Sequence, residues 1–137
     1  MIQQIDHIGI AVRQLDEHIP FYRDVLQLTG LGTEIVADQK VRVAMFRVGE
    51  VKIELLEPTS AESPIAKFIE KKGEGIHHIA YRTDDVKQEI AQIEARELRL
   101  IDQTPRAGAH GSLIAFLHPK SSGRVLTELC QKGEDQE

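Results

Sequence analysis

The stretch IDHIGIAV at residues 5–12 returns, with changes, as IHHIAYRT at residues 76–83. Each version reads as an apolar strand with a histidine near its start, namely His7 in the first and His78 in the second. The two histidines are 71 positions apart, which is about half the length of the chain. The sequence therefore indicates a duplicated structural unit.

A second pair of segments supports the same duplication. VKIELL at residues 51–56 corresponds to VLTELC at residues 125–130, and each segment places a glutamate inside an apolar strand. Glu128 follows Glu54 by 74 positions, so nearly the same offset superposes the glutamates and the histidines. Two histidines and two glutamates at equivalent places supply the ligands of one octahedral divalent metal site.

Composition excludes several classes of protein. A chain of 137 residues with 41% hydrophobic and 28% charged residues is typical of one soluble globular domain. The net charge of -5 and the 4% aromatic content argue against a nucleic-acid surface. The single Cys130 excludes an internal disulfide and a cysteine zinc site. No apolar run approaches the roughly 18 residues of a membrane span, and the strand pattern starts at Ile2, so we expect a cytoplasmic protein without a signal peptide.

Hydrophobic periodicity predicts an α+β fold of two tandem βαβββ modules in a single domain covering residues 1–137. The first module spans about residues 2–57, with strands at 2–12, 33–38, 41–48 and 51–57, the last two joined by a turn at Gly49 and Glu50. Its helix is marked by apolar residues at helical spacing, namely Leu15, Ile19, Tyr22 and Leu26. Pro20 is predicted in the first turn of this helix, and Gly30-Leu31-Gly32 is predicted to break it.

A polar linker and a bridging helix are predicted at residues 58–75, with the helix at 65–72. The second module spans about residues 76–131. We expect its helix to start after an N-cap at Asp84 and to end near Glu97, and the tail from Gly133 to be frayed. Its strands are predicted at 76–82, 98–103, 112–118 and 124–130.

Strand alternation separates the histidines from the core-facing residues. His7 shares its face with Gly9 and Ala11, and His78 shares its face with Ala80, so this side of the sheet is open enough to admit a ligand. The opposite face of the first strand carries bulky residues suited to packing against helices (Ile8, Ile10 and Val12).

Each of these residues also has an ordinary structural interpretation. A lone strand histidine is commonly a core or surface residue, and a lone strand glutamate usually faces solvent. However, burying a carboxylate without a partner costs several kcal/mol. Because the same combination occurs at matching positions of both copies, the pattern favours a metal site.

Five segments together resemble a known family, the vicinal oxygen chelate superfamily, and within it the methylmalonyl-CoA epimerases. The resemblance covers residues 2–131 and rests on the segments at residues 5–11, 54–58, 73–80, 108–111 and 116–120. It implies a curved mixed sheet around a cavity that holds one divalent metal ion, and it implies a homodimer.

The resemblance also implies which residues bind the metal. His77 aligns with Asp6 on the opposite strand face and receives no ligand role. Many epimerases carry glutamine at the position of Glu54. The metal ligands that the resemblance implies are His7, Glu54, His78 and Glu128. The ion that it favours is Co²⁺, and Mn²⁺, Ni²⁺ and Zn²⁺ are also compatible.

The implied reaction interconverts (2R)- and (2S)-methylmalonyl-CoA by removing the C2 proton through a metal-stabilised enolate. Glu128 is the first candidate for the acid/base that moves this proton. Inversion requires a second group across the substrate. Some relatives carry a glutamate where Val43 stands here, so Glu54 or a metal-bound water could take this part.

Two regions are candidates for contacts with the CoA thioester. The loop that contains Gly108, His110, Gly111 and Ser112 could offer backbone amides to an anion, or it could be a plain turn. Lys120 and Arg124 could meet the phosphates of CoA, although most such charges are simply solvated.

Two other functions remain open at this point. A glyoxalase I, which is a lyase acting on a glutathione hemithioacetal, would use the same four ligands and similar enolate chemistry. A metal-independent module that binds a small antibiotic would not require the two histidines and two glutamates. A metal analysis separates the binding module from the two enzymes.

Overall fold

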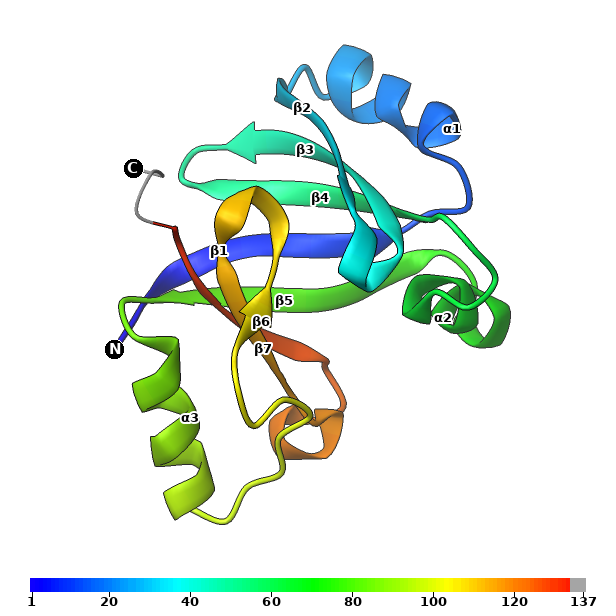
Figure 1. The fold of residues 1–137 in the computed structure, drawn as a ribbon. Helices are drawn as coiled ribbons and strands as arrows, with labels where there is room; N and C mark the ends of the chain where they lie inside the picture. Colours follow the sequence, from blue (N-terminus) through cyan, green and yellow to red (C-terminus); the bar gives the residue numbers. More distant parts are fainter. Residues whose placement is uncertain (134–137) are drawn as a thin grey trace. The chain divides into compact units, whose positions relative to one another are not determined.

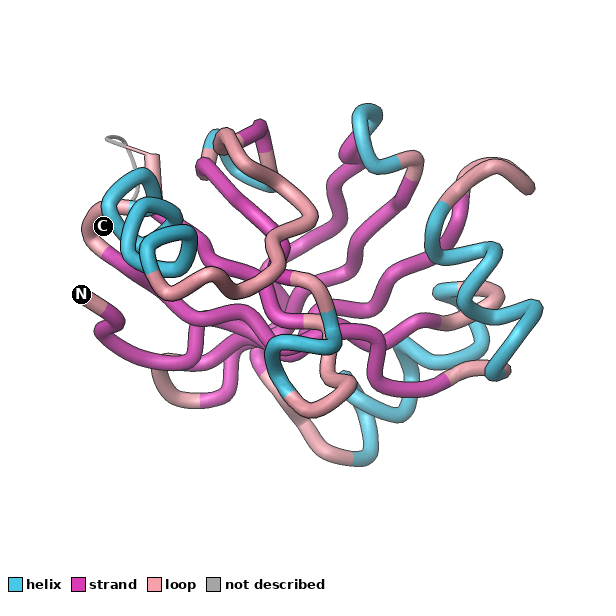
Figure 2. The backbone as a smooth tube through the Cα atoms, turned by 90° about the horizontal axis from the view of Figure 1, so that it is seen from below, coloured by secondary structure: helices cyan, strands magenta, loops and turns pink. Residues whose placement is uncertain are grey.

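A computed structural model describes residues 1–133, so part of the predicted frayed tail, residues 134–137, lies outside the described residues. The chain forms two compact units. One consists of His7–His77, and the other consists of Met1–Asp6 together with the chain from His78 onward. Figure 2 shows the chain coloured by element, with strands predominating over helices.

In the unit of residues 7–77, sheet strands follow one another in the order β2-β3-β4-β1. β1 and β4 are parallel, and the other pairs are antiparallel, so the sheet is mixed. Figure 1 shows β3 and β4 side by side as a hairpin. The elements are β1 (Ile2–Ala11, of which residues 7–11 belong here), α1 (Leu15–Pro20), η1 (Phe21–Val25), β2 (Thr29–Val36), η2 (Ala37–Gln39), β3 (Val41–Val48), β4 (Val51–Pro58) and α2 (Pro64–Lys72).

The other unit repeats this plan, with its strands in the order β5-β8-β7-β6. β5 and β8 are parallel, whereas β7 is antiparallel to both β8 and β6. The predicted α+β class and the two βαβββ modules are therefore confirmed. The elements are β5 (Gly75–Thr83, of which residues 78–83 belong here), α3 (Val86–Ala95), β6 (Arg106–Ala107), η3 (Ala109–Gly111), β7 (Leu113–Leu117), η4 (Pro119–Ser122) and β8 (Thr127–Gln131).

The first helix differs from its prediction. Pro20 is the last residue of α1 and not part of its first turn, and the chain continues as a π-helix. A proline has no N–H for the i−4 carbonyl and its ring crowds that carbonyl, which favours the wider turn. The N–H of Leu26 accordingly donates to the carbonyl of Phe21 at 2.9 Å, and the left-handed Gln27 ends the helix. Leu26, the last of the apolar residues at helical spacing, is 49% exposed.

The glycines expected to break that helix lie elsewhere. Gly30 and Gly32 are part of β2, which starts earlier than the predicted residue 33, and the register with β3 shifts between them. Gly32 has a φ of 95°, a backbone conformation that glycine adopts without strain.

Two boundaries in the second module also differ. The N-cap of α3 is Asp85 and not Asp84, because the Asp85 carboxylate accepts the N–H of Gln88 at 3.1 Å. The strand predicted at residues 98–103 is reduced to one bridge between Leu100 and Leu117, and β6 lies further on at residues 106–107. The Asp102 carboxylate takes the N–H of Phe116 at 2.8 Å, which replaces a strand–strand hydrogen bond.

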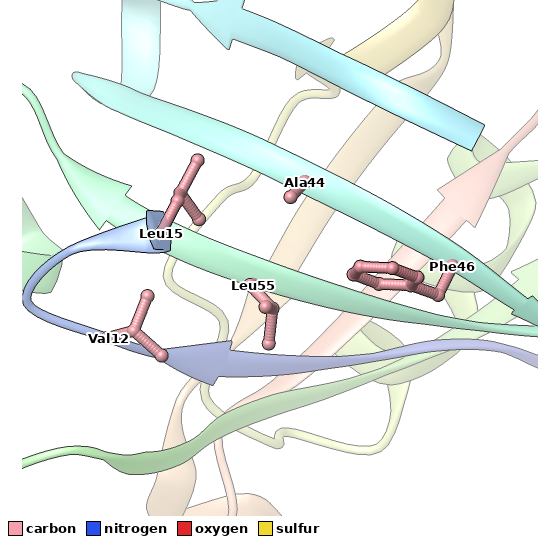
Figure 3. Close-up of a cluster of buried hydrophobic side chains, with 5 residues drawn as sticks. All are labelled: Val12, Leu15, Ala44, Phe46 and Leu55. Carbon is pink, nitrogen blue, oxygen red and sulfur yellow. The ribbon is translucent and has the colours of Figure 1, made fainter. Parts of the chain in front are cut away.

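The helices cover the face predicted from strand alternation. In the first unit, the residue that follows β1 forms a buried cluster with side chains of β3 and β4 and with the first residue of α1 (Figure 3; Val12, Leu15, Ala44, Phe46 and Leu55). In the second unit, α3 packs on β7 and β8 through an equivalent cluster (Val86, Ile90, Ala115 and Leu129). The opposite faces are left for the histidines and glutamates. Within residues 1–133, no helix is long and apolar enough to cross a membrane.

Candidate metal centre

His7 and Glu54 form a buried pair in the first unit. The parallel register of β1 and β4 sets Gly9 opposite Glu54, and His7 lies on the same strand face as Gly9. The Nδ1 atom of His7 is 3.2 Å from the Oε2 atom of Glu54. Both residues are buried, with exposures of 5% and 6%. The strand pairing itself therefore brings the imidazole and the carboxylate together.

His78 and Glu128 form the same arrangement in the second unit. The parallel register of β5 and β8 sets Ala80 opposite Glu128, and His78 lies two residues before Ala80. The Nε2 atom of His78 is 3.2 Å from the Oε1 atom of Glu128, and these residues are 5% and 4% exposed. The small residues Gly9 and Ala80 lie opposite the two glutamates, as the predicted open face requires.

The chemistry of each pair fits a divalent cation. Imidazole nitrogen and carboxylate oxygen are ligands of first-row divalent metals. Two ligands at about 2.1 Å from an octahedral ion lie about 3 Å apart, which is close to the 3.2 Å between nitrogen and oxygen in each pair. A cation would also offset the cost of burying the carboxylates. All four residues belong to groups of imidazoles and carboxylates that could hold a metal ion.

The residues that surround the two pairs differ. Met45 is the register partner of Glu54 on β3, and the nearby Val43 is also buried, so this side is apolar. Phe116 is the register partner of Glu128 on β7. Its ring meets the ring of His78 edge-to-face, with centroids 5.7 Å apart.

The residues that precede the two histidines have structural contacts. His77, which was given no ligand role, packs edge-to-face on Phe68 of α2 with centroids 5.0 Å apart. Asp6 is 1% exposed and accepts hydrogen bonds from the Arg82 guanidinium at 3.0 and 3.2 Å. His77 and Asp6 thus each have a structural partner within their own unit, and the absence of a ligand role for His77 stays a prediction.

The predicted substrate loop of Gly108, His110, Gly111 and Ser112 is a tight turn at the start of β7. The N–H of Gly108 donates to the carbonyl of Ser112 at 3.0 Å. A Cβ atom on Gly108 would lie 2.7 Å from side-chain atoms of Ser112 and Ile114, so a larger residue does not fit there. His110 and Gly111 have φ angles of 54° and 72°, and Ser112 is 6% exposed.

Lys120 and Arg124 lie on and just after η4. The N–H of Lys120 donates to Nδ1 of His118 at 3.1 Å, and the N–H of Arg124 donates to the carbonyl of Pro119 at 2.7 Å. Partial burial of the ring lowers the pKa of His118, and the positive charges of Arg99 and Lys120 add to this effect.

Two residues near Glu128 were not predicted. Phe116 could have been found once β7 and β8 were paired in register, because it lies opposite Glu128. Arg106 lies with its guanidinium carbon 5.4 Å from the centroid of the Phe116 ring. It was missed because the strand of this region was predicted too early in the sequence.

Comparison with known proteins places these observations in a family. A model of the glyoxalase/bleomycin resistance protein/dioxygenase superfamily matches residues 6–116. The chain belongs to this superfamily. Among superfamily members, the ethylmalonyl-CoA/methylmalonyl-CoA epimerase of Cereibacter sphaeroides is 36% identical over 96% of this chain and 99% of its own length. The mitochondrial methylmalonyl-CoA epimerase of Mus musculus is 34% identical over 93% of this chain and 72% of its own length.

The chain is also similar to solved structures. A variant of Streptomyces coelicolor methylmalonyl-CoA epimerase, in complex with 2-nitronate-propionyl-CoA, is 40% identical with a TM-score of 0.94. It covers 100% of this chain and 99% of its own. A hypothetical protein from Bacillus halodurans C-125 is 48% identical with the same TM-score of 0.94, over 98% and 97% of the two chains. The predicted resemblance to this superfamily and to its methylmalonyl-CoA epimerases is confirmed.

Proposed function

We propose that this protein is a metal-dependent methylmalonyl-CoA epimerase, which interconverts (2R)- and (2S)-methylmalonyl-CoA. One observation carries the proposal: a buried imidazole–carboxylate pair occurs at the same strand register in both repeats. The proposal is supported by relatives of this name that match nearly the whole chain.

We further propose that the two pairs together hold a single divalent ion through His7, Glu54, His78 and Glu128. When bound, such an ion supplies Lewis-acid stabilisation of negative charge on a thioester oxygen. The mixed nitrogen and oxygen donors suit Co²⁺, which we place first, as well as Mn²⁺, Ni²⁺ and Zn²⁺.

Glu128 is the residue that we propose moves the C2 proton. A carboxylate that is 4% exposed and held beside an imidazole and an aromatic ring has few orientations and little competing water. Glu54 is our candidate for the second proton-handling group, on the opposite side of the substrate. Val43 cannot take this part because its side chain has no ionisable group.

The remaining assignments concern the substrate and the assembly. We propose that the CoA thioester meets the turn formed by Gly108, His110, Gly111 and Ser112, whose fixed backbone can present N–H groups to an anion. Lys120 and Arg124 would contact the phosphates of CoA. We also propose that the protein acts as a homodimer in the cytoplasm.

The test is proton exchange at C2. Metal-loaded protein is incubated with one epimer of methylmalonyl-CoA in deuterated water, and deuterium entry is followed by mass spectrometry. We expect deuterium at C2 together with formation of the other epimer. Absence of exchange with turnover of a glutathione hemithioacetal would instead identify a glyoxalase I. A purified protein without stoichiometric metal and without either activity would fit the antibiotic-binding module.

A further inference from the structure

Arg106 lies on the same sheet face as Glu128. Arg106 on β6 pairs with Ile114 on β7, and residues directly opposite each other on antiparallel strands share a face. Phe116 lies two residues after Ile114 on that face, and its register partner is Glu128. The guanidinium therefore belongs to the face that carries the candidate base and not to the face covered by α3.

Two contacts hold the Arg106 side chain in place. Its guanidinium carbon lies 5.4 Å from the Phe116 ring centroid, within the range of a cation–π contact. Its Nε atom is 3.4 Å from Oδ2 of Asp102. That oxygen already accepts the N–H of Phe116 at 2.8 Å. Phe116 and Asp102 thus fix the inner part of the guanidinium.

One N–H donor of this guanidinium makes no hydrogen bond within the described part of the chain. Nε is buried and has no hydrogen-bond partner among residues 1–133. The side chain as a whole is 40% exposed, so its outer part can be reached from outside the fold. A guanidinium offers five N–H donors in a planar fork that matches a carboxylate. Such a group, fixed by stacking, is suited to bind an oxyanion.

We propose that Arg106 binds the free carboxylate of the acyl group and thereby selects dicarboxylic acyl-CoA thioesters over monocarboxylic ones. This inference rests on the proposed epimerase function. The carboxylate is bonded to C2, the carbon that loses its proton, so it must lie close to the base. Arg106 stacks on Phe116, which is opposite Glu128 and touches His78. The phosphates of CoA are separated from C2 by the pantetheine arm, which makes them the less fitting partner.

The interaction would act on both binding and reaction. A charge-assisted, bidentate contact fixes the plane of the carboxylate and hence the orientation of the C2–H bond. It also reduces the charge repulsion that opposes proton removal beside a carboxylate. Arg106 would therefore be a substrate-binding residue that sets specificity, whereas the C2 proton is transferred by other residues.

The test compares the binding of three ligands by calorimetry. Wild type, Arg106→Met and Arg106→Lys, with matched metal content, are titrated with malonyl-CoA, propionyl-CoA and CoA. Loss of a hydrogen-bonded charge contact predicts malonyl-CoA binding about tenfold to a hundredfold weaker in Arg106→Met. Propionyl-CoA and CoA should change by less than about twofold on the same reasoning. Arg106→Lys should bind malonyl-CoA with an affinity between those of wild type and Arg106→Met, because lysine keeps the charge but loses the planar, two-pronged donor geometry of the guanidinium.

Arg96→Met is the matched control, because Arg96 is exposed at the C-cap of α3. It should leave the affinities for all three ligands unchanged. An unchanged ratio of malonyl-CoA to propionyl-CoA affinity in Arg106→Met, with unchanged thermal stability, would overturn the proposal. Equal weakening of all three ligands would also overturn it, since Arg106 would then meet the CoA phosphates. Failure of the epimerase function itself would show separately, as absent deuterium exchange in the wild type.

Discussion

Leu55→Ala is expected to destabilise the first unit by about 3–5 kcal/mol. Leu55 is fully buried and pairs with Ile10 on β1 and Ala44 on β3, in the cluster of Figure 3. The substitution removes three carbon atoms, worth about 2.4 kcal/mol at about 0.8 kcal/mol each. The remainder comes from the cavity, because strands fixed by hydrogen bonds on both sides of β4 cannot move in to fill it.

Urea unfolding at 25 °C, followed by far-ultraviolet circular dichroism, measures this loss as a change in the free energy of unfolding. Leu26→Ala is the matched control, since it removes the same atoms from a side chain that is 49% exposed. It should cost less than about 1 kcal/mol. A Leu55→Ala variant that loses less than about 1 kcal/mol would refute the view that this cluster holds β4, and with it Glu54, in position.

Four further predictions follow from individual contacts. Glu128→Gln keeps the shape of the side chain but cannot take up a proton, so deuterium entry at C2 should fall about a hundredfold to ten-thousandfold; near-wild-type exchange would exclude Glu128 as the base. Removing the metal with a chelator should lower the melting temperature by about 8 °C, if the ion was present at about a hundred times its Kd; calorimetry would show no shift if these residues bind no ion. Asp85→Ala should cost about 1 kcal/mol in urea unfolding, because it deletes the N-cap of α3. The N–H of Arg13 and the ring of His18 hold the pKa of Glu74 below its usual range. The stability that the Glu74 carboxylate contributes is therefore present above the ordinary glutamate pKa and is lost as the pH falls through the lower pKa of the folded state. Glu74→Gln should flatten the acid limb of a plot of unfolding free energy against pH.

Local signals in the sequence were sufficient for much of the fold. Strands β3 and β4 are bounded by a turn whose Gly49 has a φ of 62°, and their predicted ends agree with the structure to within one residue. The prediction failed where a single side chain changes the backbone pattern. Pro20 converts the end of a helix into a π-turn, and the Asp102 carboxylate takes the place of a strand neighbour. Neither effect has a periodic signature.

The positions of the candidate site residues were predictable for a different reason. Strand alternation fixes which face a residue occupies, and the repeat identifies which faces are equivalent. Within each pair, the parallel pairing of β1 with β4 or of β5 with β8 then brings the histidine and the glutamate together. Arg106 could not be predicted in this way, because its neighbour Phe116 is assigned only when the register of β6, β7 and β8 is known.

The two repeats have kept the same His–Glu pairing while the residues around it have diverged. Beside Glu54, the facing strand presents Met45, an apolar side chain that can only pack. Beside Glu128, the facing strand presents Phe116, which carries Arg106 on its ring and therefore brings a positive charge to that face. A carboxylate near a fixed cation has a different task from one among apolar residues, because a bound anionic substrate would be oriented toward the cation. This difference in surroundings adds support to the proposal that Glu128, before Glu54, moves the C2 proton.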